Sequence, residues 1–248
     1  MTRNDLRLDQ ALVERGHFVS RARAQSAIAA GLVTVNGRAR LKPSTSVDAA
    51  ARLEIAGDVH DYVSRGGVKL QAALDAFSID PSGRICLDLG ASTGGFTEVL
   101  LRAGALKVYA VDVGHGQLHP SLLTDARVVN LEKTHAKDLT RALIPDEVSL
   151  IVADVSFISL KKALPPALAL AGPGAVLVAL VKPQFEVGQA GIGKGGLVID
   201  QDAPRRMASE IAGWLDRQYG YSPLGQIESP IAGGDGNREH LIGATCPA

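Results

Sequence analysis

The sequence predicts an α/β protein in which a small α+β unit precedes an open, doubly wound parallel sheet. Three observations lead to this prediction. Helical and strand-like segments alternate from Val68 onward, a glycine-rich turn joins a strand to a helix at residues 90–95, and positive charge is concentrated near the N-terminus. Alternating helices and strands are typical of βαβ units, and a charge asymmetry indicates separate units.

The composition excludes several classes of protein. The chain has 248 residues, with 26 basic and 26 acidic side chains, 46% hydrophobic residues and two cysteines. That balance is unlike a disordered, collagen-like or disulfide-stapled chain. Cys86 and Cys246 have no metal-ligand spacing, His115 and His119 lack the acid of a helical zinc motif, and no secretory signal opens the chain. We therefore expect a cytoplasmic protein without a metal.

One uncharged segment, residues 163–181, is nominally long enough to cross a bilayer. Pro165, Pro166 and the Gly172-Pro173-Gly174 turn predict instead that it divides into a short helix and a buried strand. A membrane-spanning helix, stable membrane association and a pore-forming protein are therefore disfavoured.

The N-terminal segment predicts two helices on a small sheet. The expected helices cover residues 6–15 and 21–30, and the expected strands cover residues 32–35 and 52–55. Ser20 is placed to cap the second helix, which Gly31 ends. The Asn36-Gly37 pair predicts a tight hairpin turn after the first strand.

Positive charge distinguishes this segment from the rest of the chain. Residues 1–42 carry eight basic and three acidic side chains, whereas residues 61–248 carry 17 and 20. Charge alone is equally consistent with a phosphate-binding face and with an ordinary solvated surface. The cations that would form the binding face are Arg3, Arg7, Arg21, Arg23, Arg38, Arg40 and Lys42.

Three motifs in this segment resemble the small RNA-binding module named after ribosomal protein S-four. They are Arg7-Leu8-Asp9, Ser20-Arg21-x-x-Ala24 and Gly31-x-Val33-x-Val35-Asn36-Gly37. The resemblance implies an RNA-binding domain over residues 1–59, followed by a linker over residues 60–66. Arg65, in that linker, completes the predicted RNA-binding set.

The rest of the chain predicts the elements of a doubly wound sheet. Helices are expected at residues 68–77, 95–103 and 204–219, and strands at residues 84–88, 107–112, 148–153, 175–181 and 240–246, with further strands near Val128 and Ile227.

A glycine-rich turn follows the first of these strands. Gly90-Ala91-Ser92-Thr93-Gly94-Gly95-Phe96 joins that strand to a helix N-terminus, at the sheet edge where α/β proteins bind ligands. Ser92 stands where a dinucleotide-binding fingerprint requires glycine. S-adenosylmethionine, which has no pyrophosphate, therefore fits better than NAD, although a turn that only connects two elements is the simpler alternative.

Acidic residues accompany this turn at the ends of successive strands. Asp88 ends the first strand, and Asp112 ends the second, where a carboxylate accepts hydrogen bonds from ribose hydroxyls. Glu132, after the third strand, is the candidate for the adenine side.

Four more charged residues lie near the ends of predicted strands. Asp154 and Lys182 each follow a strand, Glu239 comes just before the last strand, and Lys69 precedes the first strand by one helix. Taken singly, each fits an ordinary solvated strand end or helix start. Because the carboxyl ends of parallel strands meet at one edge, we expect the four side chains to lie together.

The order Lys-Asp-Lys-Glu resembles the FtsJ/RrmJ-type RNA ribose 2′-O-methyltransferases. The same resemblance is carried by the segments SRGGVKL, LDLGASTGGFTEVLL, VDVGHGQL, ADVSFISL and LVKPQFEVG. With the N-terminal module, the chain resembles the TlyA family, whose members are called hemolysins but methylate ribosomal RNA. The resemblance implies a Rossmann-like, class I S-adenosylmethionine-dependent methyltransferase domain over residues 67–248, with a seven-stranded, mostly parallel sheet. It also implies Lys69, Asp154, Lys182 and Glu239 as the catalytic set, Asp154 additionally beside the cofactor. The implied partner is ribosomal RNA in its subunits, methylated on cytidine ribose in 16S or 23S RNA or both.

The chemistry accounts for these residue types, because a ribose 2′-hydroxyl must lose a proton as it is methylated. Lys182 is predicted to take or direct that proton, with Asp154 and Glu239 orienting the amines. The segment Asp154-Val155-Ser156-Phe157 lacks the two prolines typical of enzymes that methylate exocyclic amines of DNA, and Phe157 is a predicted base-stacking platform. Residues 186–197 hold five glycines and predict either a mobile loop over the substrate or a plain connection. A non-catalytic RNA-binding assembly factor is the main alternative function.

Overall fold

The computed structural model describes residues 5–18, 20–29, 31–39, 41–55 and 62–247. The chain divides into two compact units, Met1–Asp61 and Tyr62–Ala248. Residues 60 and 61 of the predicted linker lie outside the described ranges. Tyr62, also in that predicted linker, belongs to the second unit, because its ring packs under the guanidinium of Arg102, 5.1 Å away.

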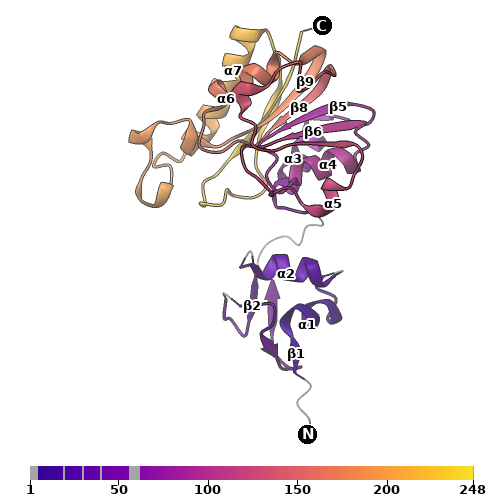
Figure 1. Ribbon diagram of the computed structural model, residues 1–248. Helices are drawn as coiled ribbons and strands as arrows, with labels where there is room; N and C mark the ends of the chain where they lie inside the picture. Colours follow the sequence, from indigo (N-terminus) through magenta and orange to yellow (C-terminus); the bar gives the residue numbers. More distant parts are fainter. Residues whose placement is uncertain (1–4, 19, 30, 40, 56–61, 248) are drawn as a thin grey trace. The chain divides into compact units, whose positions relative to one another are not determined.

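The N-terminal unit consists of β1 (Leu6–Arg7), α1 (Leu8–Glu14), α2 (Arg21–Ala29), β2 (Val33–Val35), β3 (Ser46–Val47) and β4 (Leu53–Ile55) (Figure 1). β1 pairs with β3 and β2 with β4, both antiparallel. The first predicted helix therefore starts two residues late, since Leu6 and Arg7 pair with a strand that the sequence did not indicate. At the predicted hairpin, Asn36 and Gly37 both have positive φ, at 50° and 75°.

A small apolar core holds this unit together. One cluster of apolar side chains is nearly inaccessible to solvent, and it includes Leu8, Leu12, Ile28, Val33 and Val47. Both helices contribute to it, so α1 and α2 pack on each other and on the strands.

The second unit is a seven-stranded sheet with helices on both faces. Its strands are β5 (Ile85–Leu89), β6 (Lys107–Val111), β7 (Val128–Leu131), β8 (Val148–Ala153), β9 (Ala171–Val181), β10 (Ser222–Glu228) and β11 (His240–Thr245). Its α-helices are α3 (Gly66–Phe77), α4 (Gly95–Arg102), α5 (Pro120–Leu123), α6 (Leu160–Leu168) and α7 (Ala203–Tyr219), with short 3-10 turns at Ala136–Asp138, Pro183–Phe185, Gln189–Gly191 and Lys194–Gly196. The strand order is β10-β11-β9-β8-β5-β6-β7. Only the pairings of β11 are antiparallel, so the predicted α/β class and mostly parallel seven-stranded sheet are confirmed.

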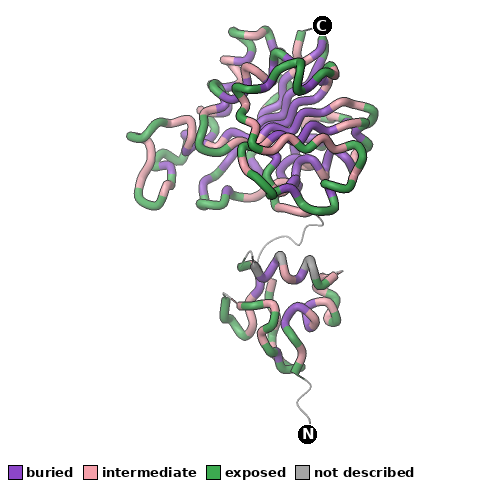
Figure 2. Tube along the Cα trace, viewed as in Figure 1, coloured by how far each residue is buried: buried purple, intermediate pink, exposed green. Residues whose placement is uncertain are grey.

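The two faces of this sheet are covered by different helices (Figure 1). One apolar cluster joins the strands to α6 and α7, and the other joins them to α3 and α4. Figure 2 shows the central strands as the most continuous buried part of the unit. Strands buried on both faces account for the near-continuous apolar runs in the sequence.

The apolar segment at residues 163–181 forms α6 and β9, as a helix followed by a strand. Pro165 and Pro166 lie inside α6 rather than ending it, and the helix continues to Leu168. β9 begins at Ala171 instead of residue 175, because the register with β8 shifts there and accommodates Pro173 and Gly174 at an exposed bulge. Within the described ranges, no helix is long and apolar enough to span a bilayer.

The strand order reverses direction at β5. The chain runs outward from β5 through β6 to β7, and then from β8 on the other side of β5 through β9. A crevice opens outside the carboxyl ends of the strands at such a reversal. The ends of β5 and β8 therefore define where a ligand site is expected.

Asp88, in β5, is a carboxyl group buried inside the unit. Its side chain is inaccessible to solvent, and its Oδ2 accepts a hydrogen bond from Thr97 Oγ1 at 2.6 Å. Burial raises the pKa of the Asp88 carboxyl to about 7, which the Thr97 hydrogen bond opposes and the negative charge of Asp154 reinforces.

We expect Asp88→Asn to change how stability depends on pH. An aspartate in an unfolded chain has a pKa of about 3.9, so the raised value means that the folded protein holds this proton more tightly. The stability that Asp88 contributes is then fully present below about pH 4 and is lost as pH rises through 7. Asp88→Asn should gain stability relative to the unchanged protein between pH 4 and 8.

The measurement is urea unfolding of both proteins across that pH range, followed by tryptophan fluorescence from Trp214. Other ionisable groups cancel in the difference between the two proteins. A difference that does not change between pH 4 and 8 would contradict a raised pKa for Asp88.

Candidate active site

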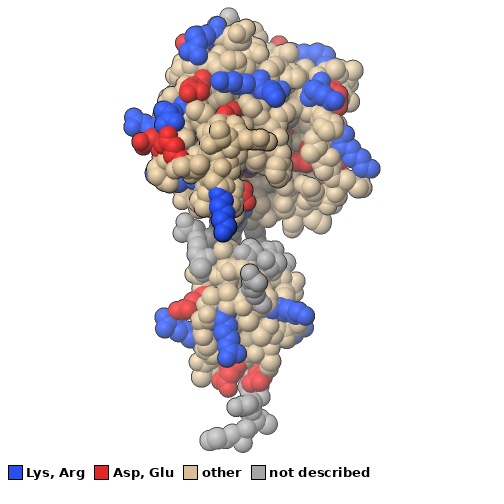
Figure 3. Space-filling view, turned by 90° about the vertical axis from the view of Figure 1, so that its left-hand side faces the viewer, with Lys and Arg blue, Asp and Glu red and all other residues tan. Residues whose placement is uncertain are grey.

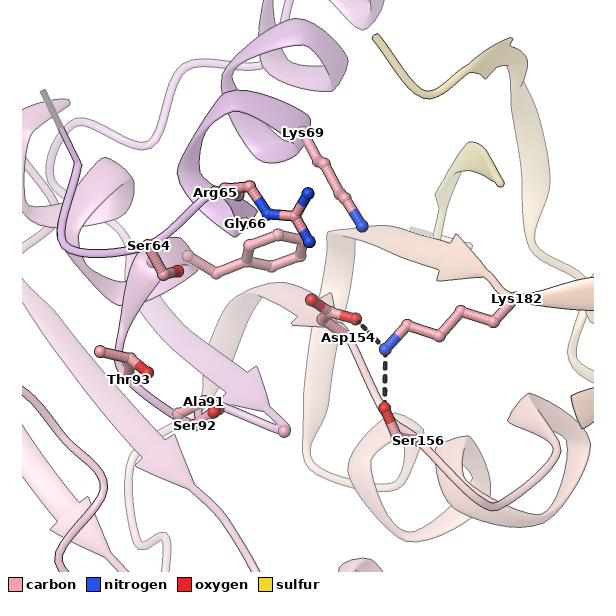
Figure 4. Close-up of a pocket in the computed structure, with 13 residues that line it drawn as sticks. Ser64, Arg65, Gly66, Lys69, Ala91, Ser92, Thr93, Asp154, Ser156 and Lys182 are labelled. Carbon is pink, nitrogen blue, oxygen red and sulfur yellow. Dashed lines mark hydrogen bonds and ion pairs between the residues drawn. The ribbon is translucent and has the colours of Figure 1, made fainter. Parts of the chain in front are cut away.

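A cavity of about 270 Å³ lies where the strand order reverses (Figure 4). It is lined by the glycine-rich turn, the beginning of α3 and side chains that follow β8 and β9. Among the predicted site residues, those lining it are Arg65, Lys69, Gly90, Ala91, Ser92, Thr93, Gly95, Phe96, Asp154 and Lys182. The cavity lining does not include the remaining predicted residues of this unit, which are Asp88, Gly94, Asp112, Glu132 and Glu239.

The four predicted catalytic charges form two ion pairs. Lys182 Nζ lies 2.6 Å from Asp154 Oδ1, and Lys69 Nζ donates a hydrogen bond to Glu239 Oε2 at 2.5 Å. Figure 4 shows the amines of Lys69 and Lys182 directed toward the Asp154 side chain. The expectation that these strand ends bring the four side chains together therefore agrees with the geometry.

The two pairs differ in burial. The side chains of Lys69 and Glu239 are 9% and 2% exposed, whereas those of Lys182 and Asp154 are 13% and 22% exposed. Burial raises the pKa of the Glu239 carboxyl, and the adjacent Lys69 amine opposes that rise. Glu239 does not line the cavity itself, and its carboxylate binds the amine of Lys69, which does.

Ser156 is a site residue that the sequence analysis did not assign. Its Oγ accepts a hydrogen bond from Lys182 Nζ at 2.8 Å, and it lines the cavity. An ammonium has three N–H donors, so the contacts with Ser156 and Asp154 restrict the rotation of the Lys182 amine. Its position two residues after Asp154, at the same strand end, was the available signal.

The glycine-rich turn requires glycine at two positions. Gly90 has φ of 88°, and a β carbon there would lie 2.6 Å from the backbone oxygen of Asp154. Gly94 has φ of 96°, and a β carbon there would lie 2.2 Å from the Leu122 side chain. The turn therefore passes between β8 and α5 with bare backbone, which a larger residue would displace.

Asp112 fixes the turn from the end of β6. Its carboxylate accepts hydrogen bonds from the backbone N–H groups of Ser92 at 2.8 Å and Gly114 at 2.7 Å. A carboxylate has about four acceptor positions, so these two bonds leave capacity for ligand hydroxyls.

Glu132 lies beside the loop that follows Asp112. It accepts hydrogen bonds from the Gly116 backbone N–H and contacts His115 Nδ1, both at 2.9 Å. The bond from Gly116 lowers the pKa of the Glu132 carboxyl to about 2, with His115 reinforcing it. Asp112 and Glu132 thus bracket the loop at residues 113–117.

Phe157 projects from the segment after β8. Its φ is 64°, an unusual value for a bulky residue, and 91% of it is exposed. Its ring lies 5.2 Å from that of Phe185, measured between centroids. Glu186 ties the two segments together, because its carboxylate accepts hydrogen bonds from Ser159 Oγ and the Leu160 N–H.

The glycine-rich segment at residues 186–197 folds back on itself. Ile192 and Val198 form an isolated bridge, and the buried Asn237 holds the segment from the other side. Asn237 Oδ1 accepts from the Val198 N–H, and its Nδ2 donates to the Gly196 carbonyl. The segment is therefore linked to the residues just before β11, which include Glu239.

Four of the predicted RNA-binding cations have described side chains in the N-terminal unit. Arg38 and Lys42 are exposed, while Arg7 and Arg21 both contact the carboxylate of Asp9. Arg3, Arg40 and the side chain of Arg23 lie outside what the structure describes. On the face in Figure 3, the Lys and Arg side chains of this unit stand at separate points with acidic side chains among them.

Among the described residues, no three or more His, Cys, Asp and Glu side chains lie close enough together to hold a metal ion.

Two family models match the chain. Residues 62–246 match the FtsJ-like methyltransferase family, and residues 6–53 match the S4 domain. Together they cover both compact units.

Two relatives are similar to this chain over most of their length. The 16S/23S rRNA (cytidine-2′-O)-methyltransferase TlyA of Mycobacterium tuberculosis is 46% identical over 95% of this chain and 88% of that protein. Hemolysin A of Brachyspira hyodysenteriae is 40% identical over 95% of this chain and 98% of that protein.

A solved structure from Streptococcus thermophilus is 38% identical, with a TM-score of 0.76 over 99% of this chain and 90% of that one. The O-methyltransferase from Bacillus cereus shares the fold, with 16% identity and a TM-score of 0.52 over 76% of this chain and 84% of that one. Because the methyltransferase model covers most of the chain and the relatives match nearly all of it, this chain belongs to the FtsJ-like methyltransferase family and carries an N-terminal S4 domain.

Proposed function

We propose that this protein transfers a methyl group from S-adenosylmethionine to the 2′-hydroxyl of a cytidine in ribosomal RNA. The observation that carries the proposal is the Lys182 amine, held by Asp154 and Ser156 at the edge of a cavity that the glycine-rich turn also lines. The relative from M. tuberculosis is named for cytidine 2′-O-methylation of 16S and 23S RNA, and one from Campylobacter jejuni for 23S RNA. The S4 domain supports an RNA substrate in ribosomal subunits.

The residues present fit S-adenosylmethionine. Gly90 lets the turn pass close to the backbone of Asp154, so that both line one cavity, while Asp112 retains acceptor capacity for ribose hydroxyls. When bound, this cofactor supplies a methyl group on a sulfonium, which is electrophilic without further activation. We assign its methionine end to the turn, and its nucleoside end to Asp112 and Glu132.

The protein's own task is then to align the hydroxyl and to remove one proton. Lys182, in its neutral form, would accept the proton of the 2′-hydroxyl. The methyl group would pass to that oxygen as its bond to the sulfonium sulfur breaks, so the products would be the methylated ribose, a neutral thioether and a protonated lysine. Asp154 and Ser156 restrict the direction of the amine before substrate arrives, and the Lys69–Glu239 pair closes the other side of the site. An amine substrate would not require a lysine in this position, which favours oxygen over nitrogen as the acceptor.

The first test is transfer of labelled methyl from S-adenosylmethionine to 30S and 50S subunits that lack the modification, with the product nucleotide mapped. We expect a 2′-O-methylated cytidine. A base-methylated product would refute the assigned chemistry, and RNA binding without any transfer would favour an assembly factor.

Lys182→Ala should abolish transfer while cofactor affinity, measured by calorimetry, stays within about threefold, because only the proton acceptor is removed. General base catalysis typically contributes about 10²–10⁴-fold in rate. The matched control is Lys161→Ala, which removes an exposed lysine from α6. Transfer by Lys182→Ala at the unchanged rate would refute the role of Lys182.

Ser156→Ala should lower kcat by about 10-fold, the effect of losing one hydrogen bond to a charged group, with little change in KM for either substrate. Ser156→Thr retains the hydroxyl and should restore most of the rate. If alanine and threonine lower kcat equally, the hydroxyl does not position Lys182.

Phe157→Ala should raise KM for the subunit by about 10-fold, since stacking of one base on an aromatic ring is worth about 1–3 kcal/mol. Phe157→Trp keeps a stacking surface and should stay near the unchanged protein. Cofactor affinity serves as the control. Equal KM values for the alanine variant and the unchanged protein would exclude Phe157 as a base platform.

A further inference from the structure

Asp9 is a fully buried carboxylate at the centre of the N-terminal unit's charged residues. It lies in the first turn of α1 and has no exposed surface. Its Oδ1 accepts from Arg7 Nε at 3.0 Å, and its Oδ2 accepts from Arg7 Nη2, Arg21 Nη2 and Gln25 Nε2 at 3.2, 2.9 and 2.7 Å. One carboxylate thereby connects β1, α1 and α2.

These contacts keep Asp9 ionised. Hydrogen bonds from Arg7 hold the pKa of the Asp9 carboxyl well below its usual range, with Gln25 and Arg21 contributing in the same direction against the effect of burial. Buried charges persist only when paired and hydrogen-bonded, and Asp9 meets that condition through three side chains.

The two arginines are not buried with it. Their side chains are 45% and 50% exposed, and the Nη2 atoms of both bind the same oxygen, Asp9 Oδ2. The two guanidinium groups therefore lie side by side at the surface with their orientation fixed from below. Two guanidinium groups that share one oxygen are close enough to repel each other, and the carboxylate between them offsets that repulsion.

We propose that Asp9 is a positioning residue that makes Arg7 and Arg21 a single binding site for an RNA phosphodiester group. The inference rests on the proposed function, because RNA is the substrate assigned there. A guanidinium presents several N–H donors in one plane, so it binds a carboxylate and a phosphate oxygen at the same time, which the single ammonium of lysine does less well. The two arginines and the one carboxylate together carry one net positive charge, which attracts the RNA phosphate.

The effect on RNA binding of removing the Asp9 charge distinguishes a positioning role from a purely electrostatic one. RNA is a polyanion, so removing a negative charge from the protein should strengthen binding if Asp9 acts only through its charge. If Asp9 orients the arginines, removing its charge should weaken binding. The sign of the change distinguishes the two.

The test compares full-length Asp9→Asn with Glu14→Gln, which removes one negative charge from an exposed position on the same helix. The dissociation constant for 50S and 30S subunits lacking the modification is measured from 50 to 300 mM KCl. We expect Asp9→Asn to bind about 10-fold more weakly, with a shallower dependence on salt because a phosphate contact is lost, and Glu14→Gln to bind at least as tightly as the unchanged protein. Asp9→Asn binding as tightly as Glu14→Gln, with an unchanged salt slope, would overturn the proposal.

Because Asp9→Asn also removes a structural contact, circular dichroism and amide hydrogen exchange must show that α1 and α2 remain folded. If they do not, Arg7→Lys and Arg21→Lys carry the test, since both keep the charge and leave Asp9 in place. Each should weaken binding several-fold. Where Asp9→Asn does remain folded, it should add nothing further in an Arg7→Gln/Arg21→Gln background. Lysine variants that bind like the unchanged protein would overturn the proposal.

The same measurements separate this inference from the proposed function. Methyl transfer by the unchanged protein tests the reaction, whereas the phosphate site is judged by the relative affinities of the variants. Binding without transfer refutes the reaction alone, and an unchanged protein that does not bind the subunits refutes the phosphate site.

Discussion

The close approach of β5 and β8 at their carboxyl ends is the constraint on which the site depends. A β carbon at Gly90 would lie 2.6 Å from the Asp154 backbone oxygen, so the chain can leave β5 only through glycine at that point. That approach places the glycine-rich turn and Asp154 on one cavity, with Lys182 at the end of the adjacent β9. Glu239 joins them because β11 pairs with β9, its His240 opposite Val181 at the same edge. The position of the four charges thus follows from strand order rather than from any local motif.

The two ion pairs differ in burial, and this difference is the basis for assigning different roles to Lys69 and Lys182. Lys69 donates to a carboxylate that is itself 2% exposed, so moving that amine would leave a buried charge unpaired. Lys182 pairs with the more exposed Asp154 and bonds to the hydroxyl of Ser156, and all three side chains line the cavity. The proposal that Lys182 is the proton acceptor therefore draws on its direct access to the cavity.

Much of the fold could be predicted because its signals are periodic or conformational. The buried strands are near-continuous apolar runs, and the Asn36-Gly37 turn requires positive φ. What escaped prediction depends on pairing between distant segments, which no local pattern encodes. Leu6 and Arg7 form a strand because β3 lies opposite, and Ser156 matters because Lys182 reaches it from another strand. Asp88 ends a predicted strand but is buried against α4, where Thr97 binds it, because helices cover both faces of the sheet.

Carboxylates that orient cations recur in both units, and this explains how a chain of zero formal net charge suits an RNA substrate. A free lysine or arginine side chain must lose rotamer freedom when it binds, which costs part of the interaction. A carboxylate that has already fixed the side chain removes much of that cost. Asp9 does this from full burial, where it cannot repel the RNA through direct contact, while Asp154 does it within the cavity. The net charge of this chain therefore does not predict whether it binds RNA, since some of its acidic residues orient the basic residues that would bind.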